Sequence, residues 1–253
     1  MFIEIEEYQI YYKFINGYNK PLIVFLHEGL GSVAQWKNFP ENVCNQSGYS
    51  ALLYDRVGHG LSSALTKARQ TDYMHIEAWQ FLPQILEKLN ITSEIILVGH
   101  SDGATIALLY ASKFAQRVKA VVSIAAHVFV EVCTVQGVAE TKKLYEEFDL
   151  KYLLEKYHLS NTDTMFYAWA DAWLSAEFKK WNIKNDIREI KAPCLLIQGE
   201  NDEYASFQQI IEIENAVSCQ VEKLIIPSCG HQPHFQHNSV VVNAINSFLA
   251  NYG

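Results

Sequence analysis

The stretch Glu94–Gly103, EIILVGHSDG, decides the fold. An apolar run of strand length leads directly into Gly99–Gly103, and an apolar pattern of helical period follows at once. The spacing G-x-S-x-G between a buried strand and a helix is typical of a nucleophile elbow, a tight turn with glycines on both sides of a central serine. We therefore expect Ser101 to stand exposed at the end of a strand, with the backbone N–H of Asp102 at a helix N-terminus. The alternative is an ordinary strand-to-helix turn in which the serine caps the helix.

The strand of this elbow is one of a series of apolar runs of strand length. Such runs are typical of strands that helices cover on both faces. The others are Pro21–His27, Tyr49–Asp55, Val118–Ala125, Cys194–Gln198 and Val221–Pro227. Ahead of them, residues 2–16 predict two short antiparallel strands, because glutamates alternate with apolar residues at the start.

Segments with helical periodicity separate these strands. Residues Tyr73–Leu89, interrupted by Pro83, place apolar side chains three and four residues apart. The residues after Ser101 and the C-terminal segment around Val241 and Ile245 do the same. Strands that alternate with helices form βαβ units, so the sequence predicts an α/β protein with a doubly wound, mostly parallel sheet of about eight strands.

One region interrupts the alternation. Between His127 and Ile190 no buried-strand run occurs, and the segments there are helical and rich in Tyr, Trp, Glu and Lys. A connection of this length exceeds the usual link between a helix and a strand. We expect residues 127–190 to form a helical cap inserted into a core domain made of residues 1–126 and 191–253. The alternative is a pair of ordinary connecting helices.

Composition and charge exclude several classes of partner. The 253 residues are 49% hydrophobic, and 28 acidic against 20 basic residues give a net charge of −8. Such a surface repels the phosphates of nucleic acid and anionic lipid, so we expect neither nucleic acid nor a membrane as partner. No apolar run is long enough to span a membrane, and the acidic N-terminus, MFIEIEEYQI, does not predict a signal peptide.

The pattern of cysteines and the absence of phosphate-binding motifs argue against disulfides, metal sites and nucleotide cofactors. The five cysteines are odd in number and lack CxxC spacing, which favours reduced thiols over a disulfide framework or a zinc site. No GxxxxGK[ST] motif and no helix-opening GxGxxG motif occurs, so we expect neither a nucleotide cofactor nor a metal. Reduced thiols are typical of a cytoplasmic protein, and the expected partner is a small-molecule substrate. A monomer and a homodimer are both compatible with the sequence.

Two later loops carry the groups that a serine nucleophile needs. A serine hydroxyl is a poor nucleophile until a base takes its proton and an acid orients that base. After a nucleophile elbow, an acid and then a histidine follow in chain order. Gly199–Asp202, GEND, directly follows one predicted strand, and Ser228–His231, SCGH, directly follows the next. Both loops leave the carboxyl ends of strands, the edge at which open α/β sheets bind ligands.

Five segments spread over nearly the whole chain resemble the α/β-hydrolase superfamily. They are HEGLGS at residues 27–32, YDRVGHGLSS at 54–63, GHSDGA at 99–104, GENDEY at 199–204 and CGHQPH at 229–234. The resemblance implies a serine hydrolase with a helical cap. It implies that Ser101 is the nucleophile, Asp202 the orienting acid and His231 the general base. It also implies that the backbone N–H groups of Gly29 and Asp102 form the oxyanion hole.

Competing residues lie beside the acid and the base. Glu200 and Glu203 flank Asp202, but the family places the acid three residues after a glycine, and this selects Asp202. His234 and His237 lie close after the predicted base, and we expect them at the rim of the pocket or on the surface. The alternative for His234 is a contact with substrate.

Further residues are expected at the same edge of the sheet. His127 follows a predicted strand and Trp173 lies in the helical insertion, so both are candidates for the substrate pocket. Glu28 stands where the family commonly has glycine; we expect it to bond loop amides, and the alternative is that it repels anionic substrates. Asp55 and Arg56 are expected to brace loops rather than to catalyse.

The predicted reaction is hydrolysis of a small to medium carboxylic ester, or of a thioester, through an acyl-enzyme on Ser101, as in a carboxylesterase. One alternative is a hydrolase or lyase that cleaves a carbon–carbon bond in a keto acid with the same triad. Such anionic substrates usually require an Arg or Lys in the pocket. A third interpretation is a non-catalytic ligand receptor on the same fold, because fold does not fix function.

Overall fold

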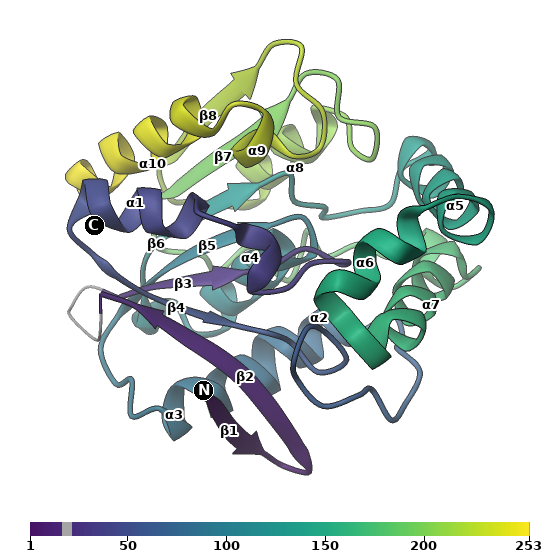
Figure 1. Ribbon diagram of the computed structural model, residues 1–253. Helices are drawn as coiled ribbons and strands as arrows, with labels where there is room; N and C mark the ends of the chain where they lie inside the picture. Colours follow the sequence, from purple (N-terminus) through teal and green to yellow (C-terminus); the bar gives the residue numbers. More distant parts are fainter. Residues whose placement is uncertain (17–21, 253) are drawn as a thin grey trace.

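The computed structural model describes residues 1–16 and 22–252. Within these ranges, eight strands form one sheet in the order β1-β2-β4-β3-β5-β6-β7-β8 (Figure 1). The strands are β1 (Phe2–Ile5), β2 (Tyr8–Ile15), β3 (Leu22–Leu26), β4 (Ser50–Tyr54), β5 (Ile95–His100), β6 (Val118–Ile124), β7 (Cys194–Gly199) and β8 (Val221–Ile226). The pairings of β1 with β2 and of β2 with β4 are antiparallel, and the others are parallel. The predicted sheet is confirmed; Pro21 lies outside the described residues.

Helices cover both faces of the sheet, which confirms the doubly wound arrangement. The helices α1 (Phe39–Ser47) and α10 (Asn238–Tyr252) pack side by side on one face (Figure 1). The other face carries α2 (Tyr73–Ile76), α3 (Leu82–Lys88), α4 (Asp102–Lys113) and α8 (Gln208–Ala216). Because α4 packs between strands β5 and β6 on one side and α2 on the other, most of its side chains are buried.

Strand β8 corrects one expectation. Every residue of β3, β4 and β5 is buried, as expected for strands covered on both faces. In β8 only Ile226 is buried, although the apolar run predicts a strand that helices cover on both faces. The strand forms the edge of the sheet, so Glu222 and Lys223 reach solvent where a central strand carries apolar side chains.

The predicted helix Tyr73–Leu89 is divided by a wider turn. A π-helical turn, η2 (Glu77–Phe81), separates α2 from α3, and Pro83 lies in the first turn of α3. Proline has no N–H and its ring clashes with the preceding turn, so the chain widens just before it. Short turns elsewhere are η1 (Ala34–Trp36), η3 (Ala115–Arg117) and α9 (Pro233–Gln236).

The segment between β6 and β7, all of which the structure describes, contains helices and no strand. These are α5 (Val132–Glu147), α6 (Leu150–His158), η4 (Leu159–Asn161), α7 (Thr162–Leu174) and η5 (Phe178–Lys180). The two ends of the segment meet at an antiparallel bridge between Phe129 and Asn182, and Ile183 N–H donates to the Val128 carbonyl over 2.8 Å. We use the word cap for residues 127–190; their division from the core as a separate domain stays a prediction.

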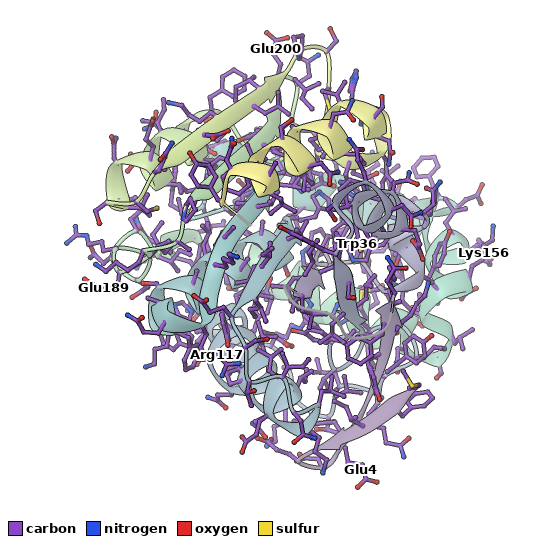
Figure 2. The ribbon with its side chains drawn as sticks, turned by 90° about the vertical axis from the view of Figure 1, so that its left-hand side faces the viewer. Glu4, Trp36, Arg117, Lys156, Glu189 and Glu200 are labelled. Atoms are coloured by element: carbon purple, nitrogen blue, oxygen red, sulfur yellow. The ribbon has the colours of Figure 1, made fainter. Side chains whose placement is uncertain are left out.

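The cap covers one end of the sheet. In the side view, Lys156 of the cap helix α6 lies at the right-hand edge of the molecule, and Arg117, directly before β6, lies left of centre (Figure 2). The covered end is the carboxyl end of the parallel strands, where the loops after β5, β7 and β8 emerge. None of the helices in the described ranges has the length and apolar character needed to cross a membrane.

Candidate active site

The turn between β5 and α4 has the geometry of a nucleophile elbow. Ser101 adopts φ 52° and ψ −119°, a conformation that a non-glycine residue rarely takes. A Cβ atom on Gly99 would lie 2.2 Å from the carbonyl oxygen of Gly103, and one on Gly103 would lie 1.9 Å from the carbonyl oxygen of Leu26. Only glycine fits at either position, which explains the G-x-S-x-G spacing physically.

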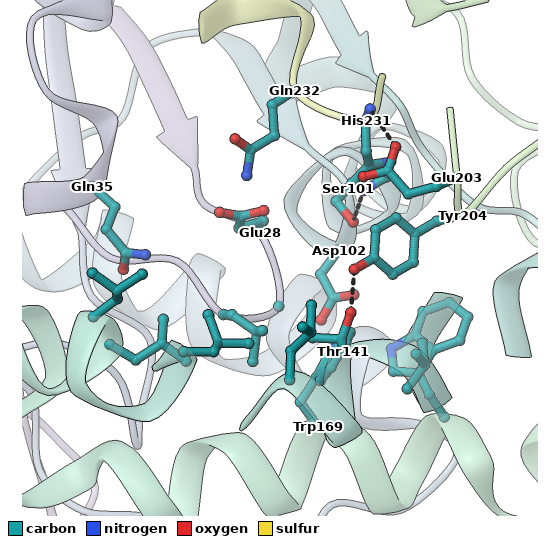
Figure 3. A pocket seen from close by; sticks show the side chains of 18 of the residues that line it. Glu28, Gln35, Ser101, Asp102, Thr141, Trp169, Glu203, Tyr204, His231 and Gln232 are labelled. Carbon is teal, nitrogen blue, oxygen red and sulfur yellow. Dashed lines mark hydrogen bonds between the residues drawn. The ribbon is translucent and has the colours of Figure 1, made fainter. Parts of the chain in front are cut away.

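Three side chains from separate loops meet at this turn. Ser101 Oγ lies 3.0 Å from Nε2 of His231, and Nδ1 of His231 lies 2.9 Å from both carboxylate oxygens of Asp202. A carboxylate only accepts, so Nδ1–H donates to Asp202 and Nε2 keeps a lone pair for the serine proton. Figure 3 shows the bond between Ser101 and His231 at the floor of the pocket.

Within the relay, His231 and Asp202 shift each other's pKa values in the direction that favours an ion pair between them. Burial alone would lower the pKa of His231, but the charge and hydrogen bond of Asp202 outweigh it, so the pKa lies above the usual value. Burial would raise the pKa of Asp202, but the charge of His231 and its hydrogen bond reverse this, so the pKa lies below the usual value. The backbone N–H groups of Tyr204 and Ala205 also donate to Asp202 Oδ1, over 2.9 and 3.2 Å.

The competing acids and histidines have other partners. Glu200 accepts from the backbone N–H of Ser228, and Glu203 accepts from the backbone N–H of His231 over 3.1 Å, so both hold the loop after β8. His234 packs against Trp36 and is not among the residues that line the pocket. The geometry thus brings Asp202 rather than either glutamate to the imidazole.

A cavity of about 510 Å³ opens above Ser101. Gly29 and Asp102, the residues expected to form the oxyanion hole, both line it. As the first residue of α4, Asp102 has a backbone N–H without an acceptor inside the helix. His127 and Trp173, the two predicted pocket residues, line the cavity as well. Their rings meet edge to face at 5.2 Å.

The cavity has an apolar and a polar wall. The apolar wall comes from helices α5 and α6 of the cap, with the side chains of Val138, Leu144, Leu150, Leu153 and Leu154. On the polar wall, Glu28 and Gln35 lie on one side of Ser101 (Figure 3). Glu203 and Tyr204 lie on the other side. The cations among the lining residues are Lys37 and Lys156, and both are exposed.

Glu28 lies in an unusual electrostatic environment. Burial raises the pKa of its carboxyl, and the charge of Asp102 adds to this, while the charge of His231 opposes it. His100 donates through Nε2 to the carbonyl of His231 over 2.8 Å, and its Nδ1 lies 3.5 Å from Glu28 Oε2. Burial lowers the pKa of His100, so its Nδ1 carries a lone pair toward the carboxyl. Glu28 therefore faces both the pocket and a neutral imidazole.

Sequence reasoning missed a polar pair inside the pocket. Tyr204 and Thr141 both line the cavity and share a hydrogen bond between their hydroxyls. Thr141 lies in α5 of the cap and Tyr204 in the loop after β7, so the bond joins the cap to the loop of Asp202. The segment GENDEY contains Tyr204, but its sequence carries no signal for a partner more than sixty residues away.

Comparisons with known proteins identify the family. Residues 21–179 match the family model described as the alpha/beta hydrolase fold. The chain belongs to this family. A solved member, the α/β-hydrolase MGS-M2 from a Medee basin deep-sea metagenome library, superposes with a TM-score of 0.81 at 20% identity, covering 99% of this chain and 97% of the other. At that identity the likeness shows the fold alone.

Among the curated relatives of this α/β-hydrolase are hydrolases of different kinds. A 2-hydroxy-6-oxo-6-phenylhexa-2,4-dienoate hydrolase of Burkholderia cepacia is 23% identical, over 90% of this chain and 87% of the relative. A proline iminopeptidase of Clostridium botulinum is 22% identical, over 96% of this chain and 95% of the relative. These two relatives differ in the bond they cleave, so membership of the alpha/beta hydrolase family gives the class of enzyme and not the substrate.

Proposed function

We propose that this α/β-hydrolase cleaves carboxylic esters with a neutral, apolar acyl group of small to medium size, through an acyl-enzyme on Ser101. The observation that carries the proposal is the relay of Ser101, His231 and Asp202, with 3.0 Å between hydroxyl and imidazole, at the floor of a cavity with an apolar wall. Thioesters of the same acyl groups fit the same argument.

The proposed reaction has two halves. His231 Nε2 accepts the proton of Ser101 as Oγ attacks the acyl carbon, and Asp202 holds the imidazole in the required tautomer. The N–H groups of Gly29 and Asp102 stabilise the tetrahedral oxyanion, an effect worth about 3 kcal/mol for each donor. The protonated imidazole then gives its proton to the leaving alcohol. Water activated by the same imidazole releases the acid and restores Ser101.

The apolar wall supports an apolar acyl group. Val138 and Leu154 are buried, whereas Leu144 and Leu153 are 48% and 51% exposed, so apolar surface extends from inside the cavity to solvent. An acyl chain lying along this wall would bury apolar surface at about 25 cal/mol per Å². The cavity volume of about 510 Å³ falls within the usual range for small-molecule sites.

A second candidate is cleavage of a carbon–carbon bond in a keto acid. It is favoured by the dienoate hydrolase of Burkholderia cepacia, whose alignment covers 90% of this chain. An anionic substrate needs a cation near the reacting carbon. Among the lining residues, carboxyl groups of Glu28 and Glu203 are drawn beside Ser101 (Figure 3), and the exposed Lys37 and Lys156 are the cations. The charge pattern therefore favours the neutral ester.

A substrate panel tests the proposal. Purified protein is given p-nitrophenyl esters from acetate to laurate, an acyl thioester and a 2-hydroxy-6-oxo dienoate, with Ser101→Ala as the control. We expect turnover of the esters, highest at intermediate chain length, and its loss in the control. Turnover of the dienoate alone would establish the second candidate. Binding of the esters without any turnover would favour a receptor.

A further inference from the structure

Arg56 is buried beside both residues that are proposed to form the oxyanion hole. Its side chain is 1% exposed and follows β4 in the segment YDRVGHG. One guanidinium nitrogen, Nη2, donates to the backbone carbonyl of Glu28 over 2.6 Å. The other, Nη1, lies 3.6 Å from Oδ2 of Asp102, whose side chain is also 1% exposed. A single buried cation therefore contacts the loop after β3 and the first residue of α4, which are far apart in sequence.

The contact with Glu28 fixes the orientation of the Gly29 N–H. The carbonyl of Glu28 and the N–H of Gly29 belong to one planar peptide unit, so holding the oxygen sets the direction of the N–H. The same carbonyl accepts a second bond from Nδ1 of His27 over 2.8 Å, and Nε2 of His27 accepts from the backbone N–H of Arg56 over 3.1 Å. Bonds to this oxygen polarise the peptide and strengthen the donor on its opposite side.

Hydrogen bonds link the side chain of Asp102 to the cap. Tyr73 in α2 donates its hydroxyl hydrogen to Asp102 Oδ2 over 2.6 Å. The indole N–H of Trp173, in α7, donates to the same hydroxyl over 3.0 Å. The side chain that follows the nucleophile is thus tied to a cap residue that lines the pocket.

We infer that Arg56 is a positioning residue for the oxyanion hole: it orients the Gly29 donor through the Glu28 carbonyl, and it holds the side chain of Asp102, the residue with the second donor, with Tyr73 as its companion. The inference rests on the proposed acyl transfer at Ser101. A purely structural explanation is weaker, because apolar side chains of similar volume often replace both members of a buried ion pair without loss of stability. What an apolar side chain does not supply is a cation and a donor to the Glu28 carbonyl.

Tetrahedral adducts separate positioning from support of the fold. A trifluoromethyl ketone with the preferred acyl chain adds to Ser101 and places an oxyanion in the hole, whereas the matched methyl ketone binds with a neutral carbonyl. In Arg56→Met we expect kcat/KM to fall on the order of 10- to 100-fold and the inhibition constant of the trifluoromethyl ketone to rise by a similar factor. The inhibition constant of the methyl ketone is expected to stay within about twofold, because uniform binding is unchanged.

Three further variants complete the design. Arg56→Lys keeps a cation without the two-point contact, so its loss is expected to lie between wild type and Arg56→Met, and it carries the test if the methionine variant does not fold. Tyr73→Phe removes one hydroxyl and is expected to show a smaller loss of the same kind. Arg117→Gln is the matched control, because Arg117 also braces a loop, through the Ile91 carbonyl over 2.7 Å, at the amino end of β6 and thus at the end of the sheet opposite Ser101.

All rates are expressed per Ser101 that reacts to completion with a fluorophosphonate, which corrects for unfolded protein. We expect Arg117→Gln to lower stability without changing kcat/KM on this basis. Equal weakening of both ketones in the Arg56 variants, or losses no larger than in Arg117→Gln, would overturn the inference. A wild-type protein that forms no adduct and turns over no ester would instead defeat the proposed function.

Discussion

At the scale of single residues, the protonation state of His231 controls the proposed chemistry. The imidazole accepts the Ser101 proton only when it is neutral, and Asp202 raises its pKa above the ordinary value of 6.5. Activity should therefore be lost as the pH falls, with a midpoint above 6.5. The acid limb of kcat/KM against pH measures this midpoint in the free enzyme. A profile that stays flat through this range would contradict the role of His231 as base.

Asp202→Asn tests the orienting acid. The amide neither stabilises the imidazolium nor fixes the tautomer, so kcat should fall on the order of 10⁴-fold. The acid limb should also move to lower pH, because the carboxylate is what raises the pKa of His231. Glu203→Gln is the matched control: it changes a neighbouring carboxylate that holds the backbone N–H of His231, and its loss should be much smaller. Equal losses in the two variants would reject Asp202.

The sequence allowed the relay of Ser101, Asp202 and His231 to be predicted, but not the buried contacts of Arg56 beside it. Ser101, Asp202 and His231 each follow a strand within a short motif, so their convergence at one sheet edge follows from the parallel topology. Arg56 also lies in a motif, but its contacts with Glu28 and Asp102 depend on side-chain directions that spacing does not specify. We expected it only to brace loops.

At the scale of elements, helix α5 should set the longest acyl chain that is accepted. Val138 is buried and lines the cavity, so Val138→Phe fills space along the apolar wall. One methylene in a hydrophobic pocket is worth about 1–3 kcal/mol, so kcat/KM for the longest good ester should fall at least about tenfold relative to the acetate. The control is Val132→Phe on the same helix, at a residue that is 75% exposed. Unchanged chain-length preference would remove α5 from the site.

Strands were easier to predict than the helices between them. The central strands are continuous apolar runs because both faces are covered, and this signal is strong. For strand β8 the prediction of burial on both faces was wrong. This strand forms the edge of the sheet and has a paired strand on one side only, which its sequence does not reveal. Helix α1 was not predicted, since only Phe39, Pro40, Val43 and Cys44 of FPENVCNQS are buried. Which side of each cap helix faces the pocket depends on packing, and the periodicity of the sequence did not predict it.

At the scale of the whole molecule, buried histidines should make stability depend on pH. Burial lowers the pKa of His158 to about 4 and that of His234 to about 3. Burial also lowers the pKa of His27, His59 and His100. The unfolded chain then binds more protons than the folded protein below the ordinary histidine value, so stability is full above that value and is lost as the pH falls. His231 and the buried carboxyls of Asp55, Glu28 and Glu77 contribute with the opposite sign, because their pKa values are raised, that of Asp55 to about 6.

Urea unfolding at about pH 7.5 and about pH 5 measures the effect, and we expect the free energy of unfolding to drop by several kcal/mol, since each pKa unit is worth about 1.4 kcal/mol. His158 accepts from the Gly60 N–H and donates to the Leu30 carbonyl, a pattern that glutamine can also supply. His158→Gln should therefore lessen the drop. Equal stability of the wild type at both pH values would contradict this account.

The central claim is that Ser101 is the nucleophile, and active-site labelling tests it most directly. Folded protein is treated with a fluorophosphonate, digested and mapped by mass spectrometry, with heat-denatured protein and Ser101→Ala as controls. We predict one label, on the peptide that contains GHSDG, absent from both controls and formed in parallel with the loss of ester turnover. Folded protein that hydrolyses esters with Ser101 unlabelled, or a Ser101→Ala variant that keeps its turnover, would contradict the account.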